Sequence, residues 1–229
     1  MNDFIMDGYQ IAAEGMDVKN LVLYYDVTGK RNIDEYRDAV INLRNAKNIG
    51  ELRNLNYTKQ SGFPRRSSIV FDGIDDYLRF TLTRYIQDIT LDLYISIDTT
   101  GNPQTIVQSG AHPYNWMLQE NNKKLQFVKN SVVYETETIV KDMKDPGYLT
   151  LVMRGNIVKI YYKDELVLSE TVGNKLSTSR GDIIYLGVSF PNSYYLKAEI
   201  FNVSLYDRSL QIGDLANNRR IDKERREKI

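Results

Sequence analysis

The chain has 229 residues, with 30 Lys and Arg against 30 Asp and Glu, one His, no Cys, 17 Tyr and 7 Phe. This length suits about one or two domains with a full hydrophobic core, and the zero net charge provides no overall positive field for nucleic acid or an anionic membrane. The absence of Cys excludes disulfides, thiolate nucleophiles and metal sites built on sulfur.

The N-terminal quarter of the chain has one clear strand signal. Residues 1–19 lack sustained periodicity and are expected to form an arm or a peripheral strand. The apolar and aromatic run Leu21–Tyr25 predicts a strand. The polar stretch 28–62 leaves two alternatives open, a helical turn over Asp34–Leu43 or a short strand over Leu52–Leu55.

Strand signals become dense after residue 67. Ser68–Phe71, the turn pair Asp72-Gly73 and Tyr77–Phe80 predict a β-hairpin, because Asp-Gly favours a tight turn between paired strands. Ile89–Ile97 is apolar at the odd positions and mostly polar at the even ones, which is typical of a half-buried strand. Shorter strands are expected at 105–107, 116–118, 125–128 and 132–134.

The last third of the chain predicts a meander and then a helix. Tyr148–Met153, Ile157–Tyr162 and Leu166–Leu168 are separated by turn residues, further strands are expected at 183–187 and 196–206, and the pattern becomes helical from Leu210. Many short strands with turns between them indicate an all-β protein, a two-sheet antiparallel sandwich with a C-terminal α-helix. The expected division is an arm at 1–19, the sandwich at 20–209 and a charged helix at 210–229.

Four segments carry a resemblance to a known family. Leu21–Asp26 looks like its opening strand, Ile69–Tyr77 matches its "FDG-x-DDY" motif, Tyr148–Tyr162 looks like its paired strands, and Glu199–Leu210 resembles its closing strand. The chain thus resembles the LamG-like branch of the concanavalin A-like lectin/glucanase superfamily, and the resemblance implies a jelly roll. Ala198 stands where that family commonly has Gly.

A narrower resemblance concerns biological context. Tyr24–Gly62, the motif above and the run Ile221–Arg225 are similar to LamG-like modules in structural proteins of phages and prophages of Gram-positive bacteria. The resemblance implies a non-enzymatic virion protein of the tail, baseplate or fibre, giving assembly contacts and host-surface glycan adhesion. Its expected partners are other virion proteins, copies of itself and bacterial cell-wall glycan, with no nucleic acid and no membrane. With no signal peptide seen, we expect folding in the host cytoplasm and localisation in the virion.

Two other functions stay open, a free carbohydrate-binding module and a glucanase-type glycoside hydrolase. A retaining hydrolase needs two carboxylates about 5–5.5 Å apart. Glu135 and Glu137 share one face of a strand, but we favour a solvated strand edge for them. His112 has no Gly-x-Ser-x-Gly elbow with it and is expected on a surface loop. We therefore expect no catalytic residues and no enzyme.

A metal site is considered at the turn near residue 72. Asp72, Asp75 and Asp76 offer the oxygen ligands that calcium takes. The alternative is that Asp72 and Gly73 form the turn while Asp75 and Asp76 hydrogen-bond to the backbone. We favour the turn and expect no cofactor.

Carbohydrate binding is predicted at two polar and aromatic loops. Sugars place their C–H faces on aromatic rings, while amides and carboxylates bind the hydroxyl groups. The candidate residues are Tyr114, Asn115 and Trp116 after a Gly/Pro loop, and Asn192, Tyr194 and Tyr195 in a later loop. Packing is the alternative in each loop: we favour the core for Trp116, and both explanations stay open for Tyr194.

The C-terminal run Arg219–Lys228 carries opposite charges at helical spacing. We expect a solvated helix whose apolar residues dock on the sandwich or on a neighbouring subunit.

Overall fold

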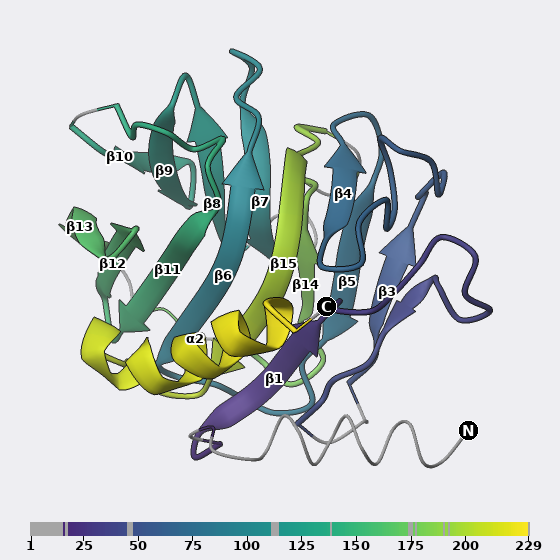
Figure 1. Cartoon of the computed structure of the whole chain (residues 1–229). Coiled ribbons are helices and arrows are strands. Elements are labelled where there is room, and N and C mark those ends of the chain that lie inside the picture. The colour runs from purple at the N-terminus through teal and green to yellow at the C-terminus, as the bar shows by residue number, and fades with distance from the viewer. Residues whose placement is uncertain are drawn as a thin grey trace.

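Two antiparallel β-sheets pack face to face in the computed structural model (Figure 1). The structure describes residues 16, 18–44, 48–110, 115–137, 139–173, 176, 178–189, 191 and 193–228. This architecture confirms the predicted all-β sandwich with a C-terminal helix.

The two sheets, called sheet A and sheet B, have seven and eight strands. Sheet A has the order β1 (Leu21–Asp26), β15 (Lys197–Tyr206), β6 (Ile89–Ile97), β11 (Gly147–Arg154), β12 (Ile157–Tyr162) and β13 (Glu165–Thr171), with β4 (Ile69–Asp72) paired to the first part of β15. Sheet B has the order β10 (Val132–Glu135), β9 (Lys124–Lys129), β8 (Trp116–Asn121), β7 (Gln104–Ser109), β14 (Ile183–Leu186), β5 (Tyr77–Thr81), β3 (Gly50–Arg53) and β2 (Ala39–Val40).

The hydrophobic core lies between the sheets and follows the alternation of the strands. Leu91, Leu93 and Ile95 of β6 belong to one buried cluster that also holds Leu118 and Phe127 of sheet B. Successive residues of a strand point to opposite faces, so the polar residues between them lie on the outer faces. The predicted meander is confirmed, because β11 pairs with β12 and β12 pairs with β13.

The predicted hairpin around Asp72-Gly73 is wrong. β4 pairs with β15 in sheet A, whereas β5 pairs with β14 and β3 in sheet B. The turn is present, with Gly73 at φ +83°, but it carries the chain from one sheet to the other. Phe71 before the turn and Phe80 after it are both buried in the core between the sheets. An Asp-Gly turn signal therefore marks a change of direction without specifying which strands pair.

Over 34–43, where a helical turn was considered, the described residues form no helix. That segment contains single turns, such as the one closed by Arg37 N–H on the Asp34 carbonyl at 3.3 Å, and ends in β2. Ala39 of β2 pairs with Glu51 of β3, so the second alternative, a short strand, is the one the chain adopts. That strand lies two residues before its expected position.

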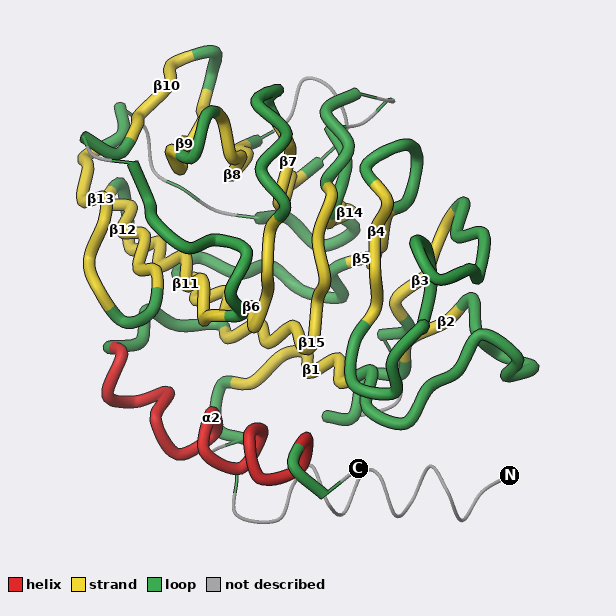
Figure 2. The backbone as a smooth tube through the Cα atoms, turned by 45° about the horizontal axis from the view of Figure 1, so that its top comes forward, coloured by secondary structure: helices red, strands yellow, loops and turns green. Residues whose placement is uncertain are grey.

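Helix α2 (Ile212–Arg226) lies across the outer face of sheet A (Figure 2). Its apolar contact is small: Leu215 and Ile221 pack with Tyr24, Tyr206 and Leu210 in a second buried cluster, separate from the main core. No helix among the described residues is long and apolar enough to cross a membrane.

Buried charged groups supply much of the remaining contact of α2. The Arg219 guanidinium donates from Nε to Asp92 Oδ2 at 3.0 Å and from Nη2 to Asp92 Oδ1 at 2.7 Å. The side chains are only 8% and 5% exposed. Arg219 Nη2 also donates to Thr150 Oγ1 at 2.6 Å, and Arg219 pairs with Asp164 of the β12–β13 turn. This two-pronged geometry is the stronger kind of arginine–carboxylate pair.

We predict that Arg219→Ala destabilises the protein by about 3–5 kcal/mol, because it leaves the Asp92 carboxylate buried without its partner. Urea unfolding followed by circular dichroism measures the change. Arg220→Ala is the matched control, since Arg220 is 58% exposed and its loss should change stability by about 0.5 kcal/mol or less. Equal effects of the two substitutions contradict the importance of the buried pair.

Candidate carbohydrate-binding surface

The three candidate residues of the first predicted loop have different outcomes in the structure. Tyr114, like His112, lies outside the described residues. Trp116 is 2% exposed and its ring stacks on Phe127 with the centroids 6.3 Å apart, so it packs in the core, as favoured above. Asn115 is exposed and its side-chain amide donates to Asp182 Oδ2 at 3.1 Å.

The two predicted loops lie at opposite ends of β7. Asn115 N–H donates to the Ser109 carbonyl at 2.8 Å, at the end of this strand. The Tyr194 carbonyl accepts from Thr105 N–H at 2.7 Å, near its beginning. Four residues of strand separate the two positions by about 13 Å. The structure therefore does not bring Asn115 and Tyr194 into one site, and Asn192 lies outside the described residues.

In the second loop, Tyr195 lies near Asp75 of the β4–β5 connection and Tyr77 at the start of β5. Tyr194 is 50% exposed, whereas Tyr195 is half-buried. Burial raises the pKa of Tyr195, and the neighbouring Asp75 and Tyr77 raise it further. We call Tyr77, Tyr194, Tyr195 and Asp75 the tyrosine surface. The ring of Tyr77 also lies 6.3 Å from the ring of Tyr185, which is buried.

Sequence reasoning missed Tyr77 and its neighbour Arg79, although both follow from the alternation of β5. Leu78 points into the core, so Tyr77 and Arg79 face outward. Arg79 donates to Glu51 Oε2 from Nε at 3.0 Å and from Nη2 at 2.7 Å. Hydrogen bonds from Arg79, then Arg53, lower the pKa of Glu51. This part of sheet B therefore presents aromatic, cationic and anionic groups side by side.

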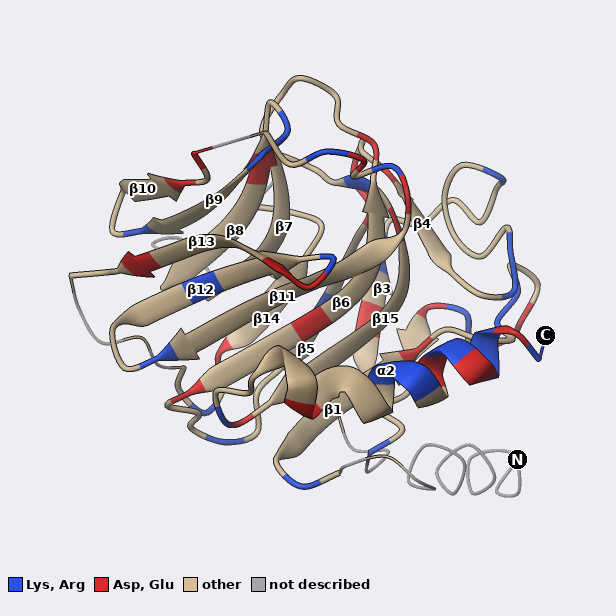
Figure 3. Cartoon of the chain, turned by 60° about the vertical axis from the view of Figure 1, so that its left-hand side comes forward, with Lys and Arg blue, Asp and Glu red and all other residues tan. Residues whose placement is uncertain are grey.

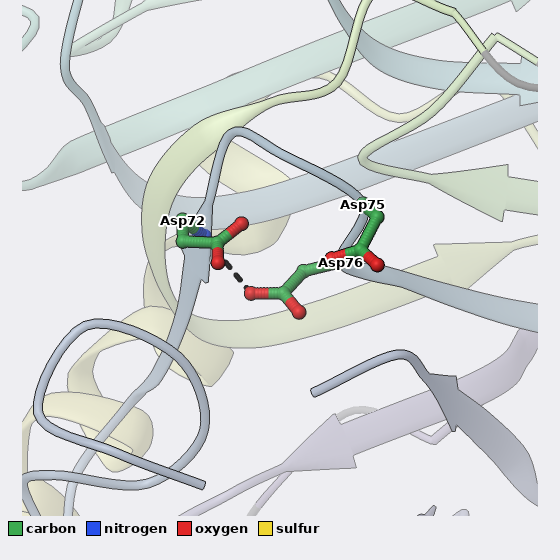
Figure 4. A group of neighbouring side chains, drawn as sticks. All are labelled: Asp72, Asp75 and Asp76. Carbon is green, nitrogen blue, oxygen red and sulfur yellow. Dashed lines mark hydrogen bonds between the residues drawn. The ribbon is translucent and has the colours of Figure 1, made fainter. Parts of the chain in front are cut away.

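The three predicted calcium ligands do come together, at the crossing between the sheets (Figure 4). Asp72, Asp75 and Asp76 each place a carboxylate oxygen within 4.8 Å of the others. Asp76 accepts Asp72 N–H at 2.9 Å and Ser61 Oγ–H at 3.1 Å, while Asp72 Oδ1 accepts Ile74 N–H at 2.8 Å. These bonds are the ones that the favoured turn explanation expects, and the calcium alternative is not tested by them.

Asp76 is buried, and its ionisation is perturbed. Its side chain is 0% exposed, and this burial raises its pKa to about 6 even though its hydrogen bonds act in the opposite direction. The nearby carboxylates of Asp72 and Asp75 also raise it. The residue therefore carries a proton more readily in the folded chain than in the unfolded one.

Glu135 and Glu137 lie where a solvated strand edge was favoured. Both are exposed, Glu135 at the end of the edge strand β10 and Glu137 just beyond it. Lys124 Nζ donates to Glu135 at 2.7 Å, and hydrogen bonds from Lys124 and Gln126 lower the pKa of Glu135. A general acid for glycoside hydrolysis needs the opposite shift, so Glu135 is poorly suited to donate a proton.

Comparison with protein families identifies the fold family of the chain. The family model described as concanavalin A-like lectin/glucanases superfamily matches residues 72–216, more than half of the sequence. The chain belongs to this superfamily. Comparison with curated protein sequences finds no significant match.

Solved structures share the lectin-like fold at low sequence identity. A Trypanosoma rangeli sialidase in complex with sialic acid has a TM-score of 0.65 at 10% identity, covering 94% of this chain and 37% of that one. A mutant of that sialidase displaying trans-sialidase activity has a TM-score of 0.67 at 12% identity, with 96% and 39% covered. The botulinum neurotoxin serotype D ligand binding domain in complex with N-acetylneuraminic acid has a TM-score of 0.64 at 13% identity, with 90% and 51% covered. The chain thus spans about two fifths of the sialidases and half of the neurotoxin chain.

The prediction that the protein is not an enzyme is corrected by these matches. Sialidases share the fold over almost the whole chain, and the superfamily includes lectins and glucanases alike. Membership of this superfamily is therefore compatible with catalysis and with binding alone, and the fold gives no ground for excluding an enzyme.

We predict that Asp76 makes the folded protein less stable as the pH rises from about 4 to about 6. Its pKa of about 6 in the folded state lies above the usual value near 3.9, so ionisation favours the unfolded chain over that range. The expected contribution is about 3 kcal/mol. Asp76→Asn should remove this pH-dependent contribution. Urea unfolding at pH 4, 5, 6 and 7 measures the free energy of unfolding of wild type and variant, and the difference between the two proteins should change between pH 4 and pH 6. A constant difference contradicts the assignment.

Proposed function

We propose that this protein binds carbohydrate through the tyrosine surface, as a component of a Gram-positive phage particle. The observation that carries the binding proposal is that Asp75 and Tyr77 lie near Tyr195, which follows the exposed Tyr194 in the chain, in a concanavalin A-like fold. Tyrosine rings offer faces for the C–H groups of a sugar, and a carboxylate accepts hydrogen bonds from its hydroxyls.

The similar structures support a saccharide as the ligand class. The sialidase was solved in complex with sialic acid, and the neurotoxin domain in complex with N-acetylneuraminic acid. The low identity means that the positions of their binding residues do not transfer to this chain. The proposal for the tyrosine surface rests on the chain's own residues.

The virion role is supported by the sequence resemblance to LamG-like modules of phage structural proteins. Under this proposal the protein resides in the tail, baseplate or fibre, contacts other virion proteins and copies of itself, and adheres to host cell-wall glycan. The rival is a free carbohydrate-binding module, and particle association separates the two.

We predict that Tyr194→Ala weakens glycan binding about five- to tenfold, because it removes an exposed ring from the tyrosine surface. A glycan array identifies the ligand, and calorimetry with that glycan measures the dissociation constant. Tyr85→Ala is the matched control: Tyr85 is 56% exposed and lies beyond the opposite end of β5. Absence of binding to every glycan, or equal losses in the two variants, contradicts the proposal.

A second prediction concerns the particle. The tagged protein should recover particle proteins from a prophage-induced lysate, and light scattering should give a mass above that of the 26.6 kDa monomer. Recovery of no particle protein together with a monomeric mass would contradict the virion role and leave glycan binding as the function.

A further inference from the structure

A second candidate site lies along α2, against the outer face of sheet A. A groove of about 650 Å³ is lined by Tyr94 and Tyr148 of sheet A, by Asp164 of the β12–β13 turn and by one face of the helix. The helical lining extends from Ile212 to Glu227, which corresponds to about 22 Å of helix. This volume lies within the range of about 300–1,000 Å³ that small-molecule sites occupy.

Two aromatic rings form the sheet side of the groove. Tyr94 and Tyr148 are directly opposite each other on β6 and β11, with ring centroids 4.8 Å apart. Both residues are half-buried. The Arg226 guanidinium lies 4.1 Å from the centroid of Tyr94, and that of Arg219 lies 4.2 Å from the centroid of Tyr148. These contacts hold the rings and the two cationic groups in fixed relative positions.

The helix side of the groove is cationic. Arg220, Lys223 and Arg226 recur three residues apart and all line it. In Figure 3 the C-terminal half of α2 carries Lys and Arg positions in blue, with Asp and Glu positions in red between them. Arg226 is held by the buried Asp222 through a 2.6 Å bond from Nη1, so its position is set before any ligand arrives. Arg220 and Lys223 are 58% and 72% exposed, and their ion pairs with neighbouring Glu residues are of the weak exposed kind.

Each of the four cations in the lining, Arg219, Arg220, Lys223 and Arg226, already has a carboxylate partner. The partners of Arg220 and Lys223 are exposed Glu side chains, so these two cations are the ones that an anionic ligand can reach. Asp164 is already paired with Arg219. Lys223 Nζ is 3.9 Å from Glu227, a loose contact that a better placed anion can replace.

We propose that this groove binds an acidic saccharide, with the sugar beside the edges of Tyr94 and Tyr148 and its carboxylate at Arg220 and Lys223. The inference rests on the proposed function in taking a saccharide as ligand, but it assigns a different site and a different charge class. The tyrosine surface carries Asp75 next to Asp72 and Asp76, and these carboxylates repel an acidic sugar. The two sites should therefore prefer different sugars.

The test uses the full chain and calorimetry with three probes. 3′-Sialyllactose and a hyaluronan tetrasaccharide supply the carboxylate from two kinds of acidic sugar, and lactose is the neutral probe. Arg220→Gln/Lys223→Gln removes two exposed charges and leaves the buried pairs of Arg219 and Arg226 in place. Lys228→Gln is the matched control, an exposed cation next to the same helix but outside the groove. Thermal unfolding shows whether the variants keep the wild-type fold.

We expect at least one acidic probe to bind about tenfold more tightly than lactose, and the double variant to lose about tenfold of that affinity, as the loss of charge-assisted hydrogen bonds predicts. Lys228→Gln and Tyr194→Ala should leave the affinity for the acidic probe within about twofold of wild type.

If binding of the acidic probe is unchanged in the double variant but lost in Tyr194→Ala, the proposed groove site is wrong and the proposed function stands. Absence of binding to both acidic probes overturns the acidic class, and a glycan array with no ligand at all overturns the proposed function as well.

Discussion

A carboxylate that is buried beneath a helix needs a cationic hydrogen-bond partner, and in this protein the buried carboxylate is that of Asp92. The residue lies on the outer face of sheet A, where α2 covers it, and Arg219 of α2 meets it with two hydrogen bonds. Removing water from both groups has a large cost, which their attraction offsets only when the geometry is good. The pair therefore specifies where the helix lies more than it adds to stability. From that placement follow the positions of Asp222 and Arg226, and with them the groove.

The two candidate surfaces differ in the charged groups beside their aromatic rings. The tyrosine surface lies beside the carboxylates of the β4–β5 crossing, whereas the groove along α2 is lined by Arg and Lys side chains of the helix. Aromatic rings are common to both surfaces, so charge is the property that separates their ligands. A chain with zero net charge can thus carry different charged groups on different surfaces, which the total charge conceals.

Local alternation was sufficient to predict most strands and the sandwich, because a half-buried strand has an unambiguous period. Pairing between strands was harder. The Asp72-Gly73 signal correctly located a turn, but whether Tyr77–Thr81 returns beside β4 or crosses to the other sheet depends on distant partners. The groove was beyond sequence reasoning for the same reason, since Asp92 and Arg219 are 127 residues apart and a charged helix is ordinarily solvated.

The tyrosines show why burial decides between packing and binding. Tyr24 donates its hydroxyl to Asp222, and Tyr206 accepts from Asn218 Nδ2 at 2.9 Å, so both rings lie in the layer beneath α2 with their polar ends already used. Such residues bridge an apolar layer and a polar one, which a tyrosine does better than any aliphatic side chain. Tyr194 differs: half of its surface is exposed, and its main chain, at φ +53°, is in the left-handed conformation. A bulky side chain at this conformation has a local energetic cost, and at Tyr194 no burial of the ring offsets that cost.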